Sequence, residues 1–218
     1  MGHNVPVPAR VIVIAGPSGS GKSRLSRRLG LPVLNLDDFY KDGDDPTLPR
    51  LDLAGGEPIT DWDDPASWLA DDAIATIERL CAGGSADVPV YDIAKSRRTG
   101  HRVLELGDAP RFVAEGIFAQ EIVGACRDGD LLADAVCLSR PAPLVFVLRL
   151  TRDLREHRKP PWVLVRRGLH LMWQQRAVVD HARALGCRVV GLNRAAAELS
   201  AAAAWPAAPS GRPPGGPR

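Results

Sequence analysis

The residues with the clearest chemistry lie in one stretch near the N-terminus, where glycines precede a lysine and a serine. The stretch comprises Gly16, Pro17, Ser18, Gly19, Ser20, Gly21, Lys22 and Ser23. Its glycines allow a tight turn whose backbone N–H groups converge on an anion at the positive end of a helix. Lys22 would reach the terminal phosphates of ATP or GTP, and the Ser23 hydroxyl would ligate Mg²⁺. The spacing predicts a nucleotide-binding loop rather than a Gly/Ser linker, which has no need of a strand before it.

Acidic residues follow two further apolar runs of the chain. Asp37 and Asp38 come directly after residues 32–36, and Glu115 lies near the end of the run 111–117. Ligands of open α/β sheets bind at the carboxyl ends of the strands, so these acids are candidates for a catalytic base and for a group near Mg²⁺. A buried carboxylate satisfied by the backbone is the alternative for Glu115.

Arginines three residues apart, Arg149 and Arg152, follow the apolar run 144–148. On a helix they would be neighbours, and guanidinium groups suit phosphate oxygens bidentately. A solvated helix surface is a serious alternative for Arg155 and Arg158. Arg149 and Arg152 are therefore the better candidates for phosphate contact.

The elements that must position these residues are apolar runs separated by helical segments. The expected strands are 11–15, 32–36, 111–117, 144–148 and 186–192, with helix one after the loop, a helix over 66–81, helix plus loop over 118–138, and a helical segment over 162–185. This alternation predicts an α/β protein with the P-loop nucleoside triphosphate hydrolase fold, a doubly wound parallel sheet of about five strands. Two partly alternating runs within about 86–106 predict a small β-hairpin appendage for the substrate.

A long loop over 42–64 ends in an aromatic and acidic group, Trp62, Asp63 and Asp64, before Pro65. Asp64 and Pro65 could be plain helix punctuation, an N-cap followed by proline at the first position. That explanation does not extend to Trp62 and Asp63, which would face the site.

Composition limits the classes of protein that fit. A formal net charge of +2 over 218 residues argues against nucleic acid or an anionic membrane as a partner. No apolar run has the length of a membrane span, and no signal peptide is evident, so we expect a cytoplasmic protein. Isolated cysteines predict buried, reduced thiols rather than zinc ligands or disulfides. We expect a leader over 1–10, one domain over 11–194 and a disordered Ala/Pro/Gly-rich tail over 195–218.

Taken together, these motifs resemble the uridine kinase and phosphoribulokinase family of P-loop kinases, most closely uridine and cytidine kinases. The resemblance covers about residues 11–159. Its carriers are the phosphate-binding loop, Asp37-Asp38-Phe39-Tyr40, Trp62-Asp63-Asp64-Pro65, Pro89-Val90-Tyr91-Asp92 followed by Arg98, Glu115-Gly116-Ile117, and Arg149 through Arg152-Asp153 into Glu156. The loop alone would name only a superfamily, whereas the order and spacing of all six name the family.

The resemblance implies a role for each carrier. Asp37 would be the general base for the acceptor hydroxyl and lie near Mg²⁺, which Glu115 would help to hold. Asp63 would bind the ribose hydroxyls, with Trp62, Tyr91, Tyr40 and Arg98 among the residues of the nucleoside pocket. Arg152, with Arg149, would belong to a lid over about 149–161 that neutralises phosphate charge. The implied reaction moves the γ-phosphate of ATP or GTP to a nucleoside 5′-OH.

Departures from the family leave the acceptor open. The histidine that usually follows the pocket tyrosine by five residues is Ser96 here, and Ile93 stands where an aromatic residue is common. Another small alcohol, such as a sugar phosphate or a pantothenate-like molecule, is one alternative. A non-catalytic nucleotide-binding module is another, although the Asp52–Gly55 match to a GTPase switch follows no strand and no guanine-reading motif is present. The sequence also leaves a homo-oligomer open.

Overall fold

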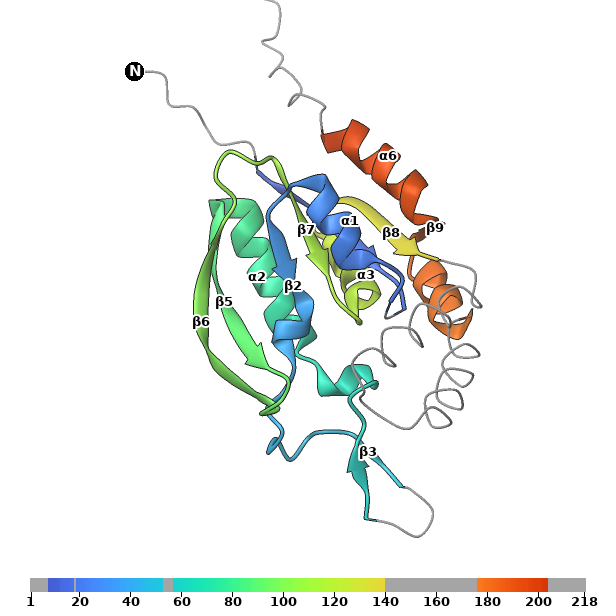
Figure 1. Ribbon diagram of the computed structural model, residues 1–218. Coiled ribbons are helices and arrows are strands. Elements are labelled where there is room, and N and C mark those ends of the chain that lie inside the picture. The colour runs from blue at the N-terminus through green and yellow to red at the C-terminus, as the bar shows by residue number, and fades with distance from the viewer. Residues whose placement is uncertain (1–7, 18, 53–56, 140–175, 204–218) are drawn as a thin grey trace, which may run out of the picture.

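A parallel five-stranded sheet forms the centre of the protein, with strand order β2-β7-β1-β8-β9. The computed structural model describes residues 8–17, 19–52, 57–139 and 176–203 (Figure 1). The strands are β1 (Arg10–Ala15), β2 (Val33–Asn35), β7 (Arg111–Glu115), β8 (Leu132–Leu138) and β9 (Arg188–Val190). Every pairing in this sheet is parallel, so the predicted α/β fold with a doubly wound parallel sheet is confirmed.

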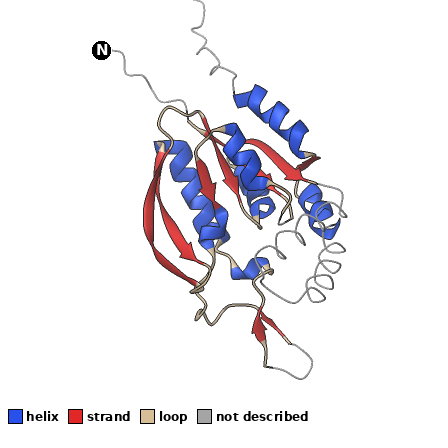
Figure 2. Ribbon diagram, in the orientation of Figure 1, coloured by secondary structure: helices blue, strands red, loops and turns tan. Residues whose placement is uncertain are grey.

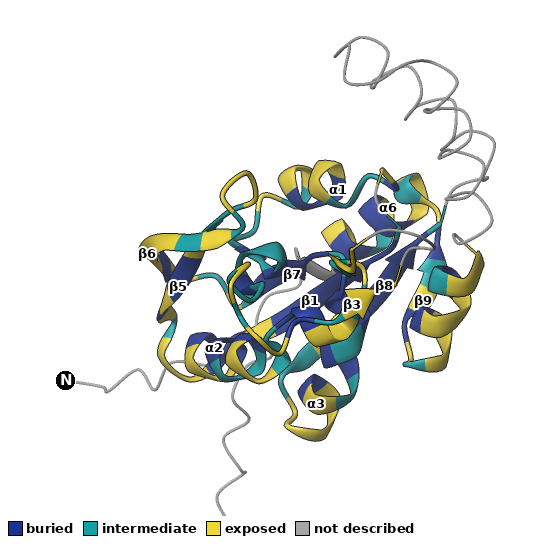
Figure 3. Ribbon diagram, turned by 90° about the horizontal axis from the view of Figure 1, so that it is seen from below, coloured by how far each residue is buried: buried dark blue, intermediate teal, exposed yellow. Residues whose placement is uncertain are grey.

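Helices cover both faces of the sheet because β1 is apolar on both sides. Val11 and Val13 pack toward α2 (Ala70–Gly83) and α3 (Val123–Asp128), whereas Ile12 and Ile14 pack toward α1 (Lys22–Leu29) and α6 (Leu192–Ala203). Figure 3 shows the buried strands between these two helical layers, whose exposed residues lie on the outside. A strand buried on both faces is the usual central strand of a parallel sheet.

One core strand of the described sheet was not predicted. Residues 132–138 were expected within a helix-plus-loop region, but they form β8, which lies between β1 and β9. Its alanines and Asp134 weaken the local strand signal, and pairing with two neighbours outweighs that propensity. The expected strand over 144–148 lies outside the described residues, as do residues 162–175. Residues 176–184 are helical and β9 forms as predicted.

The expectation of disorder from residue 195 is also wrong for the first part of that segment. Helix α6 continues to Ala203, and Ala195, Ala196 and Leu199 are buried against the sheet and α1. Alanine is the strongest helix former, and a helix with this small apolar stripe can pack closely. An Ala/Pro/Gly-rich composition predicts disorder, but the alanines of this part favour a helix. Residues 204–218 lie outside the described part.

The α6 contact can be tested by truncating its buried leucine. Leu199 is 1% exposed, so Leu199→Ala should lower the free energy of unfolding by about 3 kcal/mol through lost burial and a residual cavity. Ser200→Ala changes an exposed neighbour on the same helix and should have an effect below about 0.5 kcal/mol. Urea unfolding measures both. Equal midpoints for the two variants would mean that α6 does not pack as described.

The predicted hairpin is present and lies beside α2. It consists of β5 (Ser85–Asp92) and β6 (Arg97–Glu105) in antiparallel pairing, with β5 facing the helix (Figures 1 and 2). The preceding long loop contains a short ribbon, β3 (Arg50–Leu51) with β4 (Ile59–Thr60). This ribbon and the hairpin are the two additions to the central sheet in the described part of the chain.

Three short 3-10 helices complete the described elements: η1 (Leu36–Phe39), η2 (Pro65–Ser67) and η3 (Ala119–Ile122). Asp64 caps η2 by accepting a hydrogen bond from the Ala66 N–H, with Pro65 at the first position, so its punctuation role is confirmed. The predicted helix over 66–81 begins later, at residue 70. The four cysteines are buried thiols. Among the described residues, no helix has the length and apolar character needed to cross a membrane.

Candidate active site

The glycine-rich loop connects β1 to α1 at the point where the strand order reverses. Gly16 has a φ of 136°, and a Cβ at this position would lie 2.7 Å from the Leu138 carbonyl oxygen, so the loop passes tightly over the end of β8. Gly21 precedes α1 in the left-handed conformation, with φ 104°. Lys22 Nζ donates a hydrogen bond of 2.8 Å to the Gly16 carbonyl oxygen, which places the lysine over the loop. Ser18 lies outside the described residues.

The loop has the features that a bound phosphate requires. The backbone N–H groups in the first turn of α1 point toward the loop, as at any helix N-terminus. Because α1 begins at Lys22 without a side-chain cap, no capping side chain accepts from them. The Ser20 hydroxyl is buried and has no hydrogen-bond partner in the described part of the chain. An anion held by the helix N-terminus would satisfy such groups. The residues present therefore fit a nucleotide phosphate.

Glu115 lies at the carboxyl end of β7 and faces the start of α1. Its Oε2 accepts a hydrogen bond of 3.3 Å from the Ser23 hydroxyl. Burial raises the pKa of the Glu115 carboxyl, while the Ser23 hydrogen bond and the nearby Lys22 charge oppose that rise. The predicted neighbourhood of Ser23 and Glu115 is therefore present in the structure.

Hard oxygen ligands of the kind that Mg²⁺ prefers gather at this point: the Ser23 hydroxyl and the Glu115 and Asp37 carboxylates. The described residues contain no cluster of three or more histidine, cysteine or acidic side chains suited to a metal. Mg²⁺ commonly uses one or two carboxylates and takes its other ligands from water and substrate phosphates. The donor set therefore fits Mg²⁺ bound together with a nucleotide, and does not fit a metal held by protein alone.

Asp37 is directed toward the end of β7 by the turn that follows β2. Its Oδ1 accepts a 2.8 Å hydrogen bond from the Ile117 N–H, and Asn35 caps η1 by accepting from the Asp37 N–H. Gly116 makes the approach possible, because a Cβ there would lie 2.8 Å from Asp37 Oδ1 and 2.7 Å from the Leu36 Cβ. Asp37 and Glu115 thus come from adjacent strands to one edge of the sheet.

Asp38, which follows Asp37 in the chain, points toward the hairpin instead. Asp38 Oδ1 accepts a hydrogen bond of 3.4 Å from the Tyr91 N–H of β5, and burial raises the pKa of the Asp38 carboxyl. The structure therefore separates two adjacent carboxylates that the sequence presents as one group: Asp37 lies toward β7 and Asp38 toward the hairpin.

An aromatic wall centred on Tyr40 stands beside Asp37. The Tyr40 ring centroid lies 5.7 Å from that of Trp62, 5.8 Å from that of Tyr91 and 5.9 Å from that of Phe118. The Tyr40 hydroxyl donates to the Trp62 carbonyl oxygen, so the long loop is tied to η1. Burial, followed by the charges of Asp37 and Asp63, raises the pKa of Tyr40.

Phe118 belongs to this wall but was missed by the sequence reasoning. It also stacks near Trp68, with ring centroids 5.9 Å apart, and the Trp68 indole N–H donates to the Leu36 carbonyl oxygen. The sequence does indicate Phe118 by its position, three residues after Glu115, the acid that ends β7. A residue so soon after the carboxyl end of a strand is expected to lie near the site. The expectation of helix plus loop over 118–138 instead places this residue at the start of a helix.

Two further predicted substrate residues lie near this wall, Asp63 close to Tyr40 and Arg98 close to Tyr91. Asp63 is exposed, in the loop that carries Trp62. Arg98 donates its backbone N–H to Asp42, and its guanidinium Nη2 lies 3.7 Å from Asp72 of α2. The buried Arg98 Nε has no hydrogen-bond partner among the described residues. Arg149 and Arg152, with the predicted lid, lie outside the described residues.

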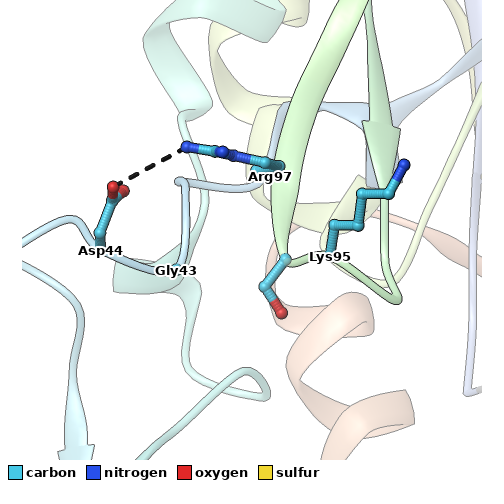
Figure 4. A pocket seen from close by; sticks show the side chains of 5 residues that line it. Gly43, Asp44, Lys95 and Arg97 are labelled. Carbon is cyan, nitrogen blue, oxygen red and sulfur yellow. Dashed lines mark ion pairs between the residues drawn. The ribbon is translucent and has the colours of Figure 1, made fainter.

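Ser96, at the position of the expected histidine, lies at the tip of the hairpin with φ 48°. Its carbonyl oxygen accepts from the Gly43 N–H, and a hollow of about 390 Å³ is lined by Gly43, Asp44, Lys95, Ser96 and Arg97. Figure 4 shows Arg97 reaching over Gly43 to Asp44, 4.0 Å away, while Lys95 points in another direction. The two cations do not converge, so the hollow is no built anion site.

Comparison with known proteins agrees with this geometry. No family model matches the chain. The chain is 31% identical over 170 residues to a uridine kinase of Deinococcus deserti, a match covering 73% of this chain and 75% of that protein. A uridine kinase of Shewanella denitrificans is 28% identical over 158 residues, covering 67% and 69%. A crystal structure from Silicibacter sp. TM1040, named for a fructose transport system kinase, matches with a TM-score of 0.56 at 18% identity, covering 88% and 91%, and so shares the fold.

The fold, the glycine-rich loop and these relatives define the class: the protein is a P-loop kinase. The Deinococcus match extends over three quarters of that relative at 31% identity. The chain accordingly belongs to the uridine kinase family.

Proposed function

We propose that this kinase transfers the γ-phosphate of ATP, as its Mg²⁺ complex, to a primary hydroxyl, the 5′-OH of a pyrimidine nucleoside. The observation that carries the proposal is the position of Asp37. Its carboxylate is held by the Ile117 N–H at the end of β7, near both Tyr40 and Glu115, and Glu115 in turn accepts from the Ser23 hydroxyl that follows the phosphate-binding loop. A base between donor phosphate and acceptor pocket is the arrangement that phosphoryl transfer to an alcohol needs.

On this proposal, the loop and Lys22 hold the triphosphate, while Asp37 accepts the proton of the acceptor hydroxyl as its oxygen attacks phosphorus. Phosphoryl transfer depends mainly on positioning and charge stabilisation, so Lys22 and the backbone N–H groups of the loop would supply most of the protein's contribution. When bound, Mg²⁺ would neutralise phosphate charge. Ser23, Asp37 and Glu115 are the residues that would hold it. Arg152 and Arg149 are proposed as further phosphate contacts.

A nucleoside suits the proposed acceptor pocket because it combines a flat base with a ribose diol. The rings of Trp62, Tyr91 and Tyr40 offer apolar and edge contacts to a base. The exposed Asp63 carboxylate can accept two hydrogen bonds from adjacent ribose hydroxyls. The buried Arg98 Nε, which has no hydrogen-bond partner within the described part of the chain, would donate one.

A different small alcohol is the second candidate, and Ser96 favours it. No histidine stands at the hairpin tip to read a pyrimidine edge, and the Ser96 Cβ is packed 3.0 Å from where a Cβ of Gly43 would lie. The short serine side chain thus faces the backbone of the 42–43 turn. A sugar phosphate or pantothenate-like acceptor would not require a base-reading side chain.

The test is ATP consumption by the purified protein with Mg²⁺ across nucleosides and other small alcohols, with the mass of each product recorded. Uridine or cytidine should gain one phosphate and adenosine should not. Turnover only with a non-nucleoside would support kinase activity and reject a nucleoside as the acceptor. Nucleotide binding without transfer to any member of the panel would contradict catalysis and favour a regulatory module.

A further inference from the structure

The tip of the β5–β6 hairpin is fastened to the segment that carries the proposed base. Four hydrogen bonds join residues 38–43 to the hairpin: Tyr91 N–H to Asp38 at 3.4 Å, Tyr91 hydroxyl to the Lys41 carbonyl oxygen at 3.0 Å, Arg98 N–H to Asp42 Oδ1 at 2.7 Å, and Gly43 N–H to the Ser96 carbonyl oxygen at 2.6 Å. The segment begins one residue after Asp37. The hairpin residues and the base are therefore held in one local unit.

An irregularity in the strand pairing of the hairpin lies directly beside two of these hydrogen bonds, those of the Tyr91 and Arg98 N–H groups. Val90 pairs with Gly100, but the next residue, Tyr91, pairs with Arg98, so Thr99 is left without a register partner. Such a bulge bends a strand and redirects its neighbouring side chains. Directly beside it, both members of the Tyr91 and Arg98 pair donate their backbone N–H groups to carboxylates outside the hairpin, Asp38 and Asp42. These two residues are also the hairpin's proposed acceptor contacts.

We propose that Asp42 is a positioning residue for the acceptor. Its carboxylate holds the Arg98 backbone and thereby sets the distance of Arg98 and Tyr91 from Asp37. The inference rests on the proposed function for the identity of the acceptor, but the anchoring of the hairpin does not depend on that identity. Within the described part of the chain, the Asp42 side chain makes no hydrogen bond to the phosphate-binding loop or to an aromatic side chain; after burial, its charge contributes to raising the pKa of the Tyr91 hydroxyl.

Asp42 carries the anchor more directly than the other contacts do. Its hydrogen bond is the shorter of the two carboxylate contacts, and it is made by a partly buried side chain that can be removed without altering a proposed ligand of the acceptor. Losing the carboxylate would leave the part-buried Arg98 N–H without its acceptor, which costs more than a solvent-exposed hydrogen bond would. The Gly43 bond uses backbone groups only, and the Lys41 carbonyl oxygen accepts from the Tyr91 hydroxyl, so neither bond involves the Asp42 side chain.

The experiment compares Asp42→Ala and Asp42→Asn with Asp44→Ala, using uridine and ATP as substrates. Asp42→Ala should raise the KM for uridine by roughly tenfold, while kcat and the KM for ATP stay within about twofold. Asp42→Asn retains an oxygen that can accept the Arg98 N–H and should stay within about threefold of wild type. Asp44 is on the same turn, with a side chain 80% exposed, and its alanine variant should match wild type.

Hydrogen exchange of peptides spanning residues 91–98 provides a readout that needs no acceptor. The Arg98 amide should exchange faster in Asp42→Ala than in wild type or Asp44→Ala. Equal exchange in all three would overturn the anchor, and an unchanged KM for uridine in Asp42→Ala would overturn the positioning role. Equal damage by alanine and asparagine would overturn the hydrogen bond as its cause. If wild type fails to phosphorylate uridine yet exchange accelerates in Asp42→Ala, the anchor stands and the pyrimidine acceptor is rejected.

Discussion

Replacing Asp37 with asparagine should reduce phosphoryl transfer by at least about a hundredfold, because the variant lacks the carboxylate that we propose as the base for the hydroxyl proton. The side-chain oxygen of asparagine can still accept the Ile117 N–H, so the turn after β2 should keep its geometry. Nucleotide binding should be largely retained, since the loop and Lys22 are untouched. Single-turnover product formation and calorimetric titration with ATP measure the two properties separately.

Asp38→Asn is the matched variant for this prediction. Asp38 lies next in the chain but accepts from the Tyr91 N–H, and its asparagine also keeps an oxygen there. It should lose far less turnover than Asp37→Asn. The reverse order of effects would move the base from Asp37 to Asp38. Weak nucleotide binding with transfer preserved in Asp37→Asn would remove that residue from the role altogether.

Gly116→Ala should produce the second large loss, although the change adds only one methyl group. That methyl would lie 2.7 Å from the Leu36 Cβ and 2.8 Å from Asp37 Oδ1, so the η1 turn must move away from β7. Displacing a catalytic group by about 1 Å can cost about a hundredfold in rate. Overpacking of this buried position should also lower the free energy of unfolding by about 1–3 kcal/mol.

Gly124→Ala provides the control for an added methyl group. Gly124 lies in α3, and a Cβ there would meet nothing within 4 Å, so the variant should keep wild-type kinetics and gain slightly in helix stability. Steady-state kinetics and thermal unfolding of both variants decide the matter. If Gly116→Ala were as active as Gly124→Ala, the close approach of Asp37 to the end of β7 would not matter for catalysis.

Local patterns were sufficient to predict the nucleotide side of the site. The β-branched run before the loop, the glycines within it and the Lys22–Ser23 pair act over a few consecutive residues, so spacing alone indicates their geometry. The same holds for Asp37 and Glu115, because acids directly after buried strands of a parallel sheet meet at its carboxyl edge. The hairpin was also predictable, since its strands alternate and its turn is polar.

Long-range packing decided the features that were missed. Strand β8 carries alanines and Asp134, and only its place between β1 and β9 makes it a strand. Helix α6 looked like part of a disordered tail, but its small residues fit against α1 and the sheet, which no local window reveals. Phe118 joined the aromatic wall through contacts with Tyr40 and Trp68, from two distant parts of the chain.

By itself, the sequence determined the class of this protein, the phosphate-binding loop and the acids at the strand ends, because each depends on short-range spacing. Only the tertiary structure decided how two adjacent acids divide their contacts. Asp37 reaches the Ile117 N–H across Gly116, while Asp38 and Asp42 reach the bulged pair of the hairpin. These contacts join residues 53 to 80 positions apart in the sequence. Their geometry therefore follows from how the sheet, the η1 turn and the hairpin pack together.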